Sequence, residues 1–196
     1  MTQRTLAVVS AGLGRPSSTR LLADRLAAAT AAALPAEIVT IELRDHAHDL
    51  ASNLVTGFAP EALRRTIDAV TGADGLIAVT PIFSASYSGL FKTFFDVLDK
   101  DALEGRPVLI GATGGTARHS LALEHAVRPL FSYLRARTVP TAVYAATEDW
   151  ADSGDLVGRV EQAAAELAAA VRANPPVVRD DPYADPVTSF EDLLAG

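Results

Sequence analysis

The chain has 196 residues and a formal net charge of −7, and 49% of its residues are hydrophobic. This length predicts a single domain, and the apolar fraction supplies a hydrophobic core, which excludes a chain that is disordered throughout. The excess of acidic residues excludes nucleic acid as the main partner because its phosphates would be repelled. Cysteine is absent, so disulfides, thiolate metal sites and a cysteine nucleophile are excluded as well.

The same sequence predicts a cytoplasmic protein without a membrane anchor. Residues 1–10 lack the long apolar core of a signal peptide. Nowhere does the sequence contain about 18 uninterrupted apolar residues, the length that a membrane-spanning helix requires. A chain without cysteine also needs no oxidising compartment.

Five short apolar runs, rich in β-branched residues and bounded by Gly, Pro or polar residues, predict buried strands. Longer segments between them repeat apolar residues at helical spacing. The predicted strands are Leu6–Ser10, Glu37–Leu43, Gly75–Val79, Pro107–Ala112 and Ala142–Ala146. The predicted helices are Ser17–Leu34, Pro60–Thr71, Tyr87–Leu98, Thr116–Leu134 and about Asp155–Ala173.

This alternation of strands and helices predicts an α/β fold with a parallel sheet covered on both faces. At this length we expect the flavodoxin-like form, a three-layer sandwich whose five strands have the order 2-1-3-4-5. The domain would cover residues 1–173. Residues 174–196 form a tail rich in Pro and Asp, and its prolines exclude a continuous helix. The tail is either a loosely held terminus or an arm that contacts a neighbouring subunit.

In this fold the loops after the first, third and fourth strands meet at one edge of the sheet, where ligands bind. The first loop, Ser10–Arg20, leads into a helix, whose free N–H groups and dipole favour an anion. A phosphate monoester needs several donors, and this loop offers hydroxyl groups and a guanidinium. The predicted phosphate ligands are Ser10, Arg15, Ser17, Ser18 and Thr19.

Two other interpretations of this loop stay open. Ser17 or Ser18 can simply cap the helix that follows. The segment Gly12–Ser17 is also close to the G-x-G-x-x-G fingerprint, and Glu42 lies in the second predicted strand where a ribose-binding acid would be expected. A Rossmann-type dinucleotide site is therefore the alternative, although serine replaces the last glycine.

The other two loops carry flat apolar side chains and consecutive glycines. In the loop Thr80–Gly89, Phe83 and Tyr87 supply flat surfaces for a planar heterocycle, unless they are core residues. In the loop Ala112–Ser120, consecutive glycines allow the backbone to approach a flat ligand closely. His119 lies in this loop, where a single histidine is either a packed or capping group or a catalyst.

No segment carries a nucleophile with its base or a metal-binding signature. The motifs G-x-S-x-G and H-E-x-x-H and a P-loop lysine are absent from the sequence. Loops that bind a phosphate and a flat ring without acid–base residues favour chemistry in which a bound cofactor carries the reactivity itself. We therefore expect neither a catalytic side chain nor a metal.

Three segments occur in an order and at a spacing that resemble a known family. They are Ala73–Phe83, Tyr87–Lys92, and Thr113–Thr116 with His119, and Ala126–Leu130 extends the similarity. The family is that of the NAD(P)H-dependent FMN reductases of flavodoxin-like fold. Most similar are the reductase components of two-component alkanesulfonate-type monooxygenases, and in particular a branch that partners luciferase-like flavin monooxygenases.

The resemblance implies an enzyme that reduces FMN with NADPH or NADH and supplies reduced FMN to a separate luciferase-like monooxygenase. The first loop would hold the FMN phosphate, the second would line the isoalloxazine, and the third would close over its polar edge. The implied ring contacts are Pro81, Ile82, Phe83, Ser84 and Tyr87, and those of the third loop are Thr113, Gly114, Gly115, Thr116 and His119. Family members are usually homodimers or homotetramers, built through the helix that corresponds to residues 87–98.

The chain also departs from its family. The second loop often has Tyr-Lys where this chain has Phe83-Ser84, so a phenol and a charge near the flavin are absent. His125 stands where alkanesulfonate relatives carry Tyr or His in a π-helical bulge, a feature typical of functional sites. His125 would either influence flavin transfer or assembly, or lie at a subunit contact.

Two further functions suit the same three loops. One is a quinone or azo reductase that keeps its FMN bound and reduces another substrate. The other is a flavin-binding electron carrier that is not an enzyme and has no nicotinamide site.

Overall fold

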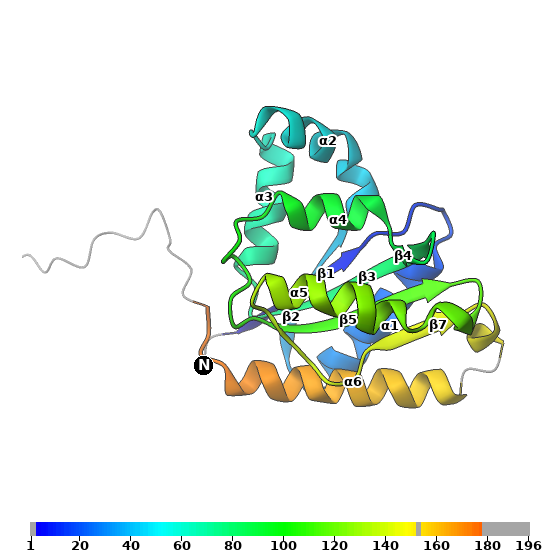
Figure 1. Ribbon diagram of the computed structural model, residues 1–196. Helices are drawn as coiled ribbons and strands as arrows, with labels where there is room; N and C mark the ends of the chain where they lie inside the picture. Colours follow the sequence, from blue (N-terminus) through cyan, green and yellow to red (C-terminus); the bar gives the residue numbers. More distant parts are fainter. Residues whose placement is uncertain (1–2, 152–153, 178–196) are drawn as a thin grey trace, which may run out of the picture.

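The computed structural model describes residues 3–151 and 154–177, which form a parallel sheet between two layers of helices (Figure 1). The long strands are β1 (Arg4–Ser10), β2 (Ala36–Glu42), β3 (Gly75–Phe83), β5 (Pro107–Gly114) and β7 (Val143–Ala146). Strand β1 lies between β2 and β3, and β5 lies between β3 and β7, all in parallel pairs. Because β5 and β7 are the fourth and fifth predicted strands, the flavodoxin-like order 2-1-3-4-5 is confirmed.

Two short strands complete the sheet. Strand β6 (Arg137–Thr138) pairs with the start of β5, while β7 pairs with its end, so both occupy the same edge. Strand β4 (Ser86–Tyr87) folds back on β3 as an antiparallel hairpin. The hairpin is the one departure from parallel pairing in the described part of the chain.

Each face of the sheet buries its own core. Successive residues of β1 supply the two cores alternately, Leu6 and Val8 on one side and Ala7 and Val9 on the other. One side is covered by α1 (Ser18–Ala33) and α6 (Gly154–Ala173) (Figure 1). The other side is covered by α2 (Ala47–Thr56), α3 (Glu61–Thr71), α4 (Gly89–Asp96) and α5 (Arg128–Tyr133).

The predicted helix Thr116–Leu134 is broken into three pieces. A 3₁₀ turn covers Ala117–His119, a π-helical turn covers Leu123–Val127, and α5 follows. Pro129 has no N–H to donate to the carbonyl of His125, so a regular α-helix cannot run through this point. The π-helical turn contains His125, at the position where the family resemblance implies one.

The second predicted loop is partly strand. We expected the third strand to end at Val79, but β3 runs to Phe83 and reverses through Ser84 and Ala85. Both turn residues have positive φ, 49° and 66°, which matches the two-residue hairpin turn whose twist suits the strands. Tyr87, predicted to begin a helix, therefore lies in β4, and α4 begins at Gly89.

Helix α2 was not predicted. Its buried side chains are Leu50 and Asn53, so the sequence shows no continuous apolar stripe. A 3₁₀ turn, Leu43–His46, joins this helix to β2. No helix in the described ranges is both long enough and apolar enough to cross a membrane.

Asp74 joins three parts of the chain at the amino edge of the sheet. Its buried carboxylate accepts hydrogen bonds from the N–H of Thr5 at 2.8 Å and of Val177 at 3.0 Å, and pairs with Arg4 at 2.9 Å. Burial alone would raise the pKa of Asp74, but these three partners outweigh it and lower the pKa. The segment after α6 is thereby attached to the domain as far as Val177. The rest of the predicted tail, and the subunit contact expected of it, lie outside the described residues.

Candidate flavin-binding site

The first loop lies between β1 and α1 at the carboxyl edge of the sheet. Ser17 has an extended backbone and caps α1, because its Oγ accepts a hydrogen bond from the N–H of Arg20 at 3.2 Å. Ser18 is the first residue of the helix and is exposed. The first turn of α1 has no acidic residue, so no carboxylate of that turn neutralises the positive end of the helix dipole.

Ser10 lies at the end of β1 and is 1% exposed. Its hydroxyl has no hydrogen-bond partner among the described residues. Such a group costs about 1–3 kcal/mol, so this position favours a ligand that brings acceptor atoms. Next to it, a Cβ on Gly12 would lie 2.0 Å from Oγ of Ser17, so glycine is needed for this close approach. The cradle of Ser10, Gly12 and Ser17 fits a phosphate.

The guanidinium of Arg15 is bound to a carboxylate from another segment. Nη2 donates to Oδ1 of Asp45 at 3.2 Å, and the Arg15 side chain is 75% exposed. Asp45 belongs to the 3₁₀ turn after β2, which therefore lies beside the first loop. The contact of Arg15 with phosphate stays a prediction.

The segment after β2 braces the first loop, a feature that sequence reasoning missed. Arg44 donates from Nη1 to the carbonyl oxygen of Gly14 and forms an ion pair with Glu42 through Nη2. Glu42 also pairs with Arg20 at 2.7 Å, and the hydrogen bond from Arg20 to Asp24 raises the pKa of Arg20. Glu42 is thus held by two guanidinium groups, and β2 lies at the sheet edge. The Rossmann alternative is wrong for two reasons. The strand order of this sheet differs from that of a Rossmann sheet. The acid of a Rossmann site would bind a ribose, whereas Glu42 binds the guanidinium groups of Arg20 and Arg44.

The second loop is a hairpin that presents Phe83 at the rim. Thr80 is buried, and its Oγ1 accepts a hydrogen bond from the N–H of Ser88 at 3.0 Å, which ties the two sides of the hairpin together. Phe83 is 48% exposed at the end of β3. Tyr87 lies opposite Ile82, and its ring centroid is 6.0 Å from that of Phe91. Phe83 is therefore available to a ligand, whereas Tyr87 packs toward α4.

The third loop follows β5 and is shaped by Tyr144. The Tyr144 hydroxyl donates to the carbonyl oxygen of Thr116 at 2.9 Å, and burial, followed by the charge of Asp149, raises the Tyr144 pKa. A Cβ on Gly114 would lie 2.1 Å from the same hydroxyl, whereas a Cβ on Gly115 would meet no atom within 4 Å. The backbone can therefore pass close to Tyr144 only with glycine at position 114.

The three loops meet because β1, β3 and β5 are neighbours in the sheet. Ser10 lies opposite Val79 of β3, and Pro81 lies opposite Thr113 of β5. The hydroxyls of Thr19 and Thr113 share a hydrogen bond of 2.9 Å, which joins the first loop directly to the third. His119 lies exposed in the 3₁₀ turn of the third loop. The predicted phosphate residues and third-loop residues thus form one continuous edge.

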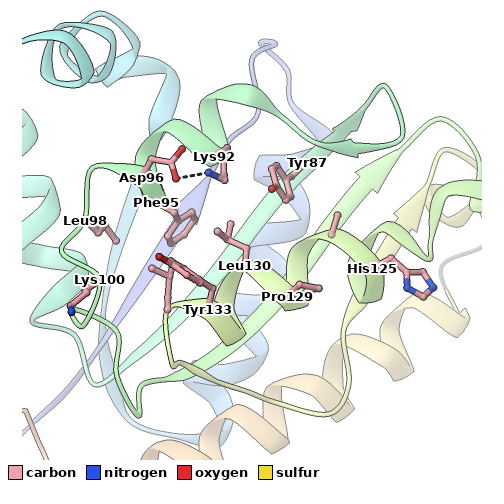
Figure 2. A pocket seen from close by; sticks show the side chains of 12 residues that line it. Tyr87, Lys92, Phe95, Asp96, Leu98, Lys100, His125, Pro129, Leu130 and Tyr133 are labelled. Atoms are coloured by element: carbon pink, nitrogen blue, oxygen red, sulfur yellow. Dashed lines mark hydrogen bonds and ion pairs between the residues drawn. The ribbon is translucent and has the colours of Figure 1, made fainter.

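Beside this edge, a groove separates α4 from the π-helical turn and α5 (Figure 2). Apolar and charged side chains line it, among them Phe95 and Lys92 on α4 and Leu130 and Tyr133 on α5. Tyr133 is 78% exposed. His125 and Tyr87 are at the end of the groove that is nearer the three loops (Figure 2).

A family model described as NADPH-dependent FMN reductase matches residues 4–151. The chain belongs to this family. It is an NAD(P)H-dependent FMN reductase, as the resemblance of its segments implies, and FMN and a nicotinamide are its reactants.

Relatives of this FMN reductase include enzymes named for either nicotinamide. The chain is 42% identical to the FMN reductase (NADPH) of Pseudomonas aeruginosa over 161 residues, which cover 82% of this chain and 86% of the relative. It is also 42% identical to the NADH-dependent FMN reductase SfnF of Pseudomonas fluorescens over 171 residues, which cover 84% and 91%.

Solved structures agree with the fold of the FMN reductase. An oxidoreductase from Corynebacterium diphtheriae has a TM-score of 0.86 and 46% identity, over 89% of this chain and 100% of that one. The apo form of an NADH:FMN oxidoreductase (EmoB) has a TM-score of 0.78 and 29% identity, over 90% and 94%. A Bacillus anthracis azoreductase, 14% identical over 86% of this chain and 100% of that one, has a TM-score of 0.57 and shares the fold alone.

Proposed function

We propose that this FMN reductase is the reductase component of a two-component system. It transfers a hydride from NADPH or NADH to FMN and then releases the reduced FMN to a separate, luciferase-like flavin monooxygenase. The observation that carries the proposal is the carboxyl edge of the sheet: Ser10, at the end of β1, has a buried hydroxyl without a partner among the described residues, and Phe83, at the end of the neighbouring strand β3, is half-exposed. A site of this kind suits a flavin that enters and leaves as a substrate.

Within this proposal the first loop binds the FMN phosphate. Ser10 contributes a hydroxyl that has no partner in residues 3–151 and 154–177, and Ser18 and Thr19 lie in the first turn of α1, whose dipole favours the anion. Ser17 contributes from the cap position, and Arg15 adds a charged donor. These five residues supply the donors that a doubly charged phosphate requires.

The second and third loops bind the ring. Phe83 would present an apolar face, and the backbone of Pro81, Ile82 and Ser84 would line the ring edge, with Tyr87 nearby in β4. The third-loop contacts would be Thr113, Gly114, Gly115, Thr116 and His119. When bound, FMN supplies the hydride-accepting N5 itself, so the side chains orient the rings and exclude water without transferring a proton.

We also propose that the enzyme is a homodimer or homotetramer built through residues 87–98. The groove between α4 and α5 supports this, because it exposes Tyr133 beside Phe95 and Leu130. The variant Tyr133→Lys places a charge on this face without touching the core. It should shift the molecular mass in solution toward the monomer, as measured by light scattering. An unchanged mass would place the interface elsewhere.

A flavin-exchange experiment tests the main proposal. Anaerobic enzyme is mixed with NADPH or NADH and an excess of FMN, and loss of the oxidised flavin absorbance is followed. Many equivalents of FMN should be reduced per enzyme. When oxygen is then admitted together with a flavin monooxygenase and its substrate, the reduced FMN released by the reductase should support turnover of that substrate. Retention of one flavin with rapid reduction of a quinone would favour the quinone or azo reductase. Tight FMN binding without nicotinamide oxidation would favour the electron carrier.

The proposed location is the cytoplasm, where both nicotinamides are available. The absence of cysteine from the sequence is compatible with that reducing compartment.

A further inference from the structure

The arginine side chains beside the first loop differ in how many partners bind their guanidinium groups. Arg20 is bound by both Asp24 and Glu42, each at 2.7 Å, and Arg44 is bound by Glu42 and by the carbonyl of Gly14. These guanidinium groups are attached at two points and are not free to turn toward a ligand.

Arg15 differs from them. Within the described chain its ion-pair partner is Asp45, at 3.2 Å, with side-chain exposures of 75% and 56%. Water and salt screen a pair that is this exposed, so it is easily broken. A doubly charged phosphate is a stronger acceptor than one carboxylate and can accept two parallel hydrogen bonds from a guanidinium, whereas Asp45 accepts a bond from Nη2 of Arg15 through Oδ1.

Asp45 has a second guanidinium beside it. Nε of Arg44 is buried and has no hydrogen-bond partner among the described residues, and it lies 3.9 Å from Oδ1 of Asp45. This separation is longer than a hydrogen bond but within ion-pair range. If Arg15 left, the Asp45 carboxylate would retain a cationic neighbour and would no longer be held away from the buried Nε. Breaking the Arg15–Asp45 pair therefore leaves no isolated charge.

We propose that Asp45 competes with the FMN phosphate for Arg15 and so lowers the affinity of the enzyme for FMN. Binding of the phosphate transfers Arg15 from Asp45 to the ligand, and departure of the flavin returns it. The inference rests on the proposed role of Arg15 in phosphate binding. A reductase that releases its product needs such a limit on affinity, because a tightly held flavin would leave slowly. Asp45 thus acts on specificity and release without touching the ring.

A double-mutant cycle on FMN affinity tests this competition. Dissociation constants for FMN and for riboflavin, which lacks the phosphate, are measured by quenching of flavin fluorescence in the wild type and in Asp45→Asn, Arg15→Ala and the double variant. Asp45→Asn should tighten FMN binding by about two- to five-fold, the factor that corresponds to an exposed ion pair, and leave riboflavin unchanged. FMN dissociation, followed by stopped flow, should slow by a similar factor.

The double variant separates competition from simple repulsion between Asp45 and phosphate. Under competition, Asp45→Asn has no effect on FMN once Arg15 is alanine. An equal tightening in both backgrounds would overturn the proposal in favour of repulsion. Asp49→Asn removes the same charge from the first turn of α2 and is the control; a tightening as large as that of Asp45→Asn would also overturn it.

The remaining outcomes distinguish this inference from the proposed function. If Arg15→Ala weakens FMN but not riboflavin while Asp45→Asn changes neither, the competition is wrong and the phosphate role of Arg15 stands. If Arg15→Ala weakens both flavins equally, Arg15 does not bind phosphate, so both the competition and the phosphate role of Arg15 are wrong while the proposed reductase activity is unaffected.

Discussion

Replacement of Asp74 by asparagine should destabilise the domain, and the loss should depend on pH. The carboxylate uses both oxygens: Oδ2 accepts the N–H of Thr5, and Oδ1 accepts the N–H of Val177 and binds Arg4. Asparagine has nearly the same shape but one acceptor oxygen. Whichever way the amide turns, one side of this network faces an NH₂ group instead of an acceptor.

The size of the expected loss in unfolding free energy follows from the burial of Asp74. Asp74 is 7% exposed, and the Thr5 N–H bond is buried. A buried donor left without an acceptor costs about 1–3 kcal/mol, and the charge-assisted part of the other bonds is lost as well. We expect Asp74→Asn to lower the free energy of unfolding by about 2–4 kcal/mol near neutral pH.

The pH dependence follows from the lowered pKa of Asp74 in the folded state. A carboxyl with a lowered folded pKa contributes stability that is fully present above its unfolded pKa of about 3.9. That contribution is lost as the pH falls through the folded pKa. The wild type and Asp74→Asn should therefore differ most near neutral pH and converge in acid.

Urea denaturation at several pH values is the assay, with Asp68→Asn as the control because Asp68 is an exposed residue of α3 and loses the same charge. A difference between wild type and Asp74→Asn that stays constant down to pH values below about 3.9 would refute the role of the ionised carboxylate. Equal effects of the two substitutions would refute the importance of the network.

Three other changes test the site. Arg15→Ala should weaken FMN more than riboflavin by about 1.5–3 kcal/mol, measured by fluorescence titration, and equal losses would contradict a phosphate contact. Ser10→Ala removes a buried hydroxyl that has no partner in the described part of the chain. It should weaken FMN yet keep the free energy of unfolding or raise it by up to about 1 kcal/mol, and a large destabilisation would show that the hydroxyl is bonded in the free protein. Gly114→Ala places a Cβ 2.1 Å from the Tyr144 hydroxyl and should cost about 1–3 kcal/mol in thermal or urea unfolding. Tyr144→Phe should recover part of that loss, and no recovery would locate the strain elsewhere.

The strands were predictable because their apolar runs are continuous and both faces of the sheet are covered. Leu6 to Val9 are all buried, and they alternate between the two cores. The carboxyl-edge loops followed from that topology, since parallel strands end at one edge. The extension of β3 through Pro81 was missed, because proline lacks the N–H that a central strand donates.

Other features could not be read from residue type or spacing. The hairpin turn Ser84-Ala85 lacks the Asn-Gly signal typical of positive φ at both turn residues. Arg44 and Asp45 reach the first loop across 30 residues of sequence, so they look like ordinary surface charges until the fold brings them together. Pro129, in contrast, was a readable signal for the break before α5.

The hydrogen bond between Thr19 and Thr113 has a consequence for ligand length. Both threonines are buried, one on the helix that would receive the phosphate and one on the strand that leads to the ring-contacting loop. The separation between the two ends of the site is therefore set by the scaffold and does not adjust to the ligand. Under the proposed placement of phosphate and ring, a flavin whose ribityl chain is shorter or longer would satisfy one end only, and this pair of hydroxyls would make the site selective for the distance between a phosphate and a ring.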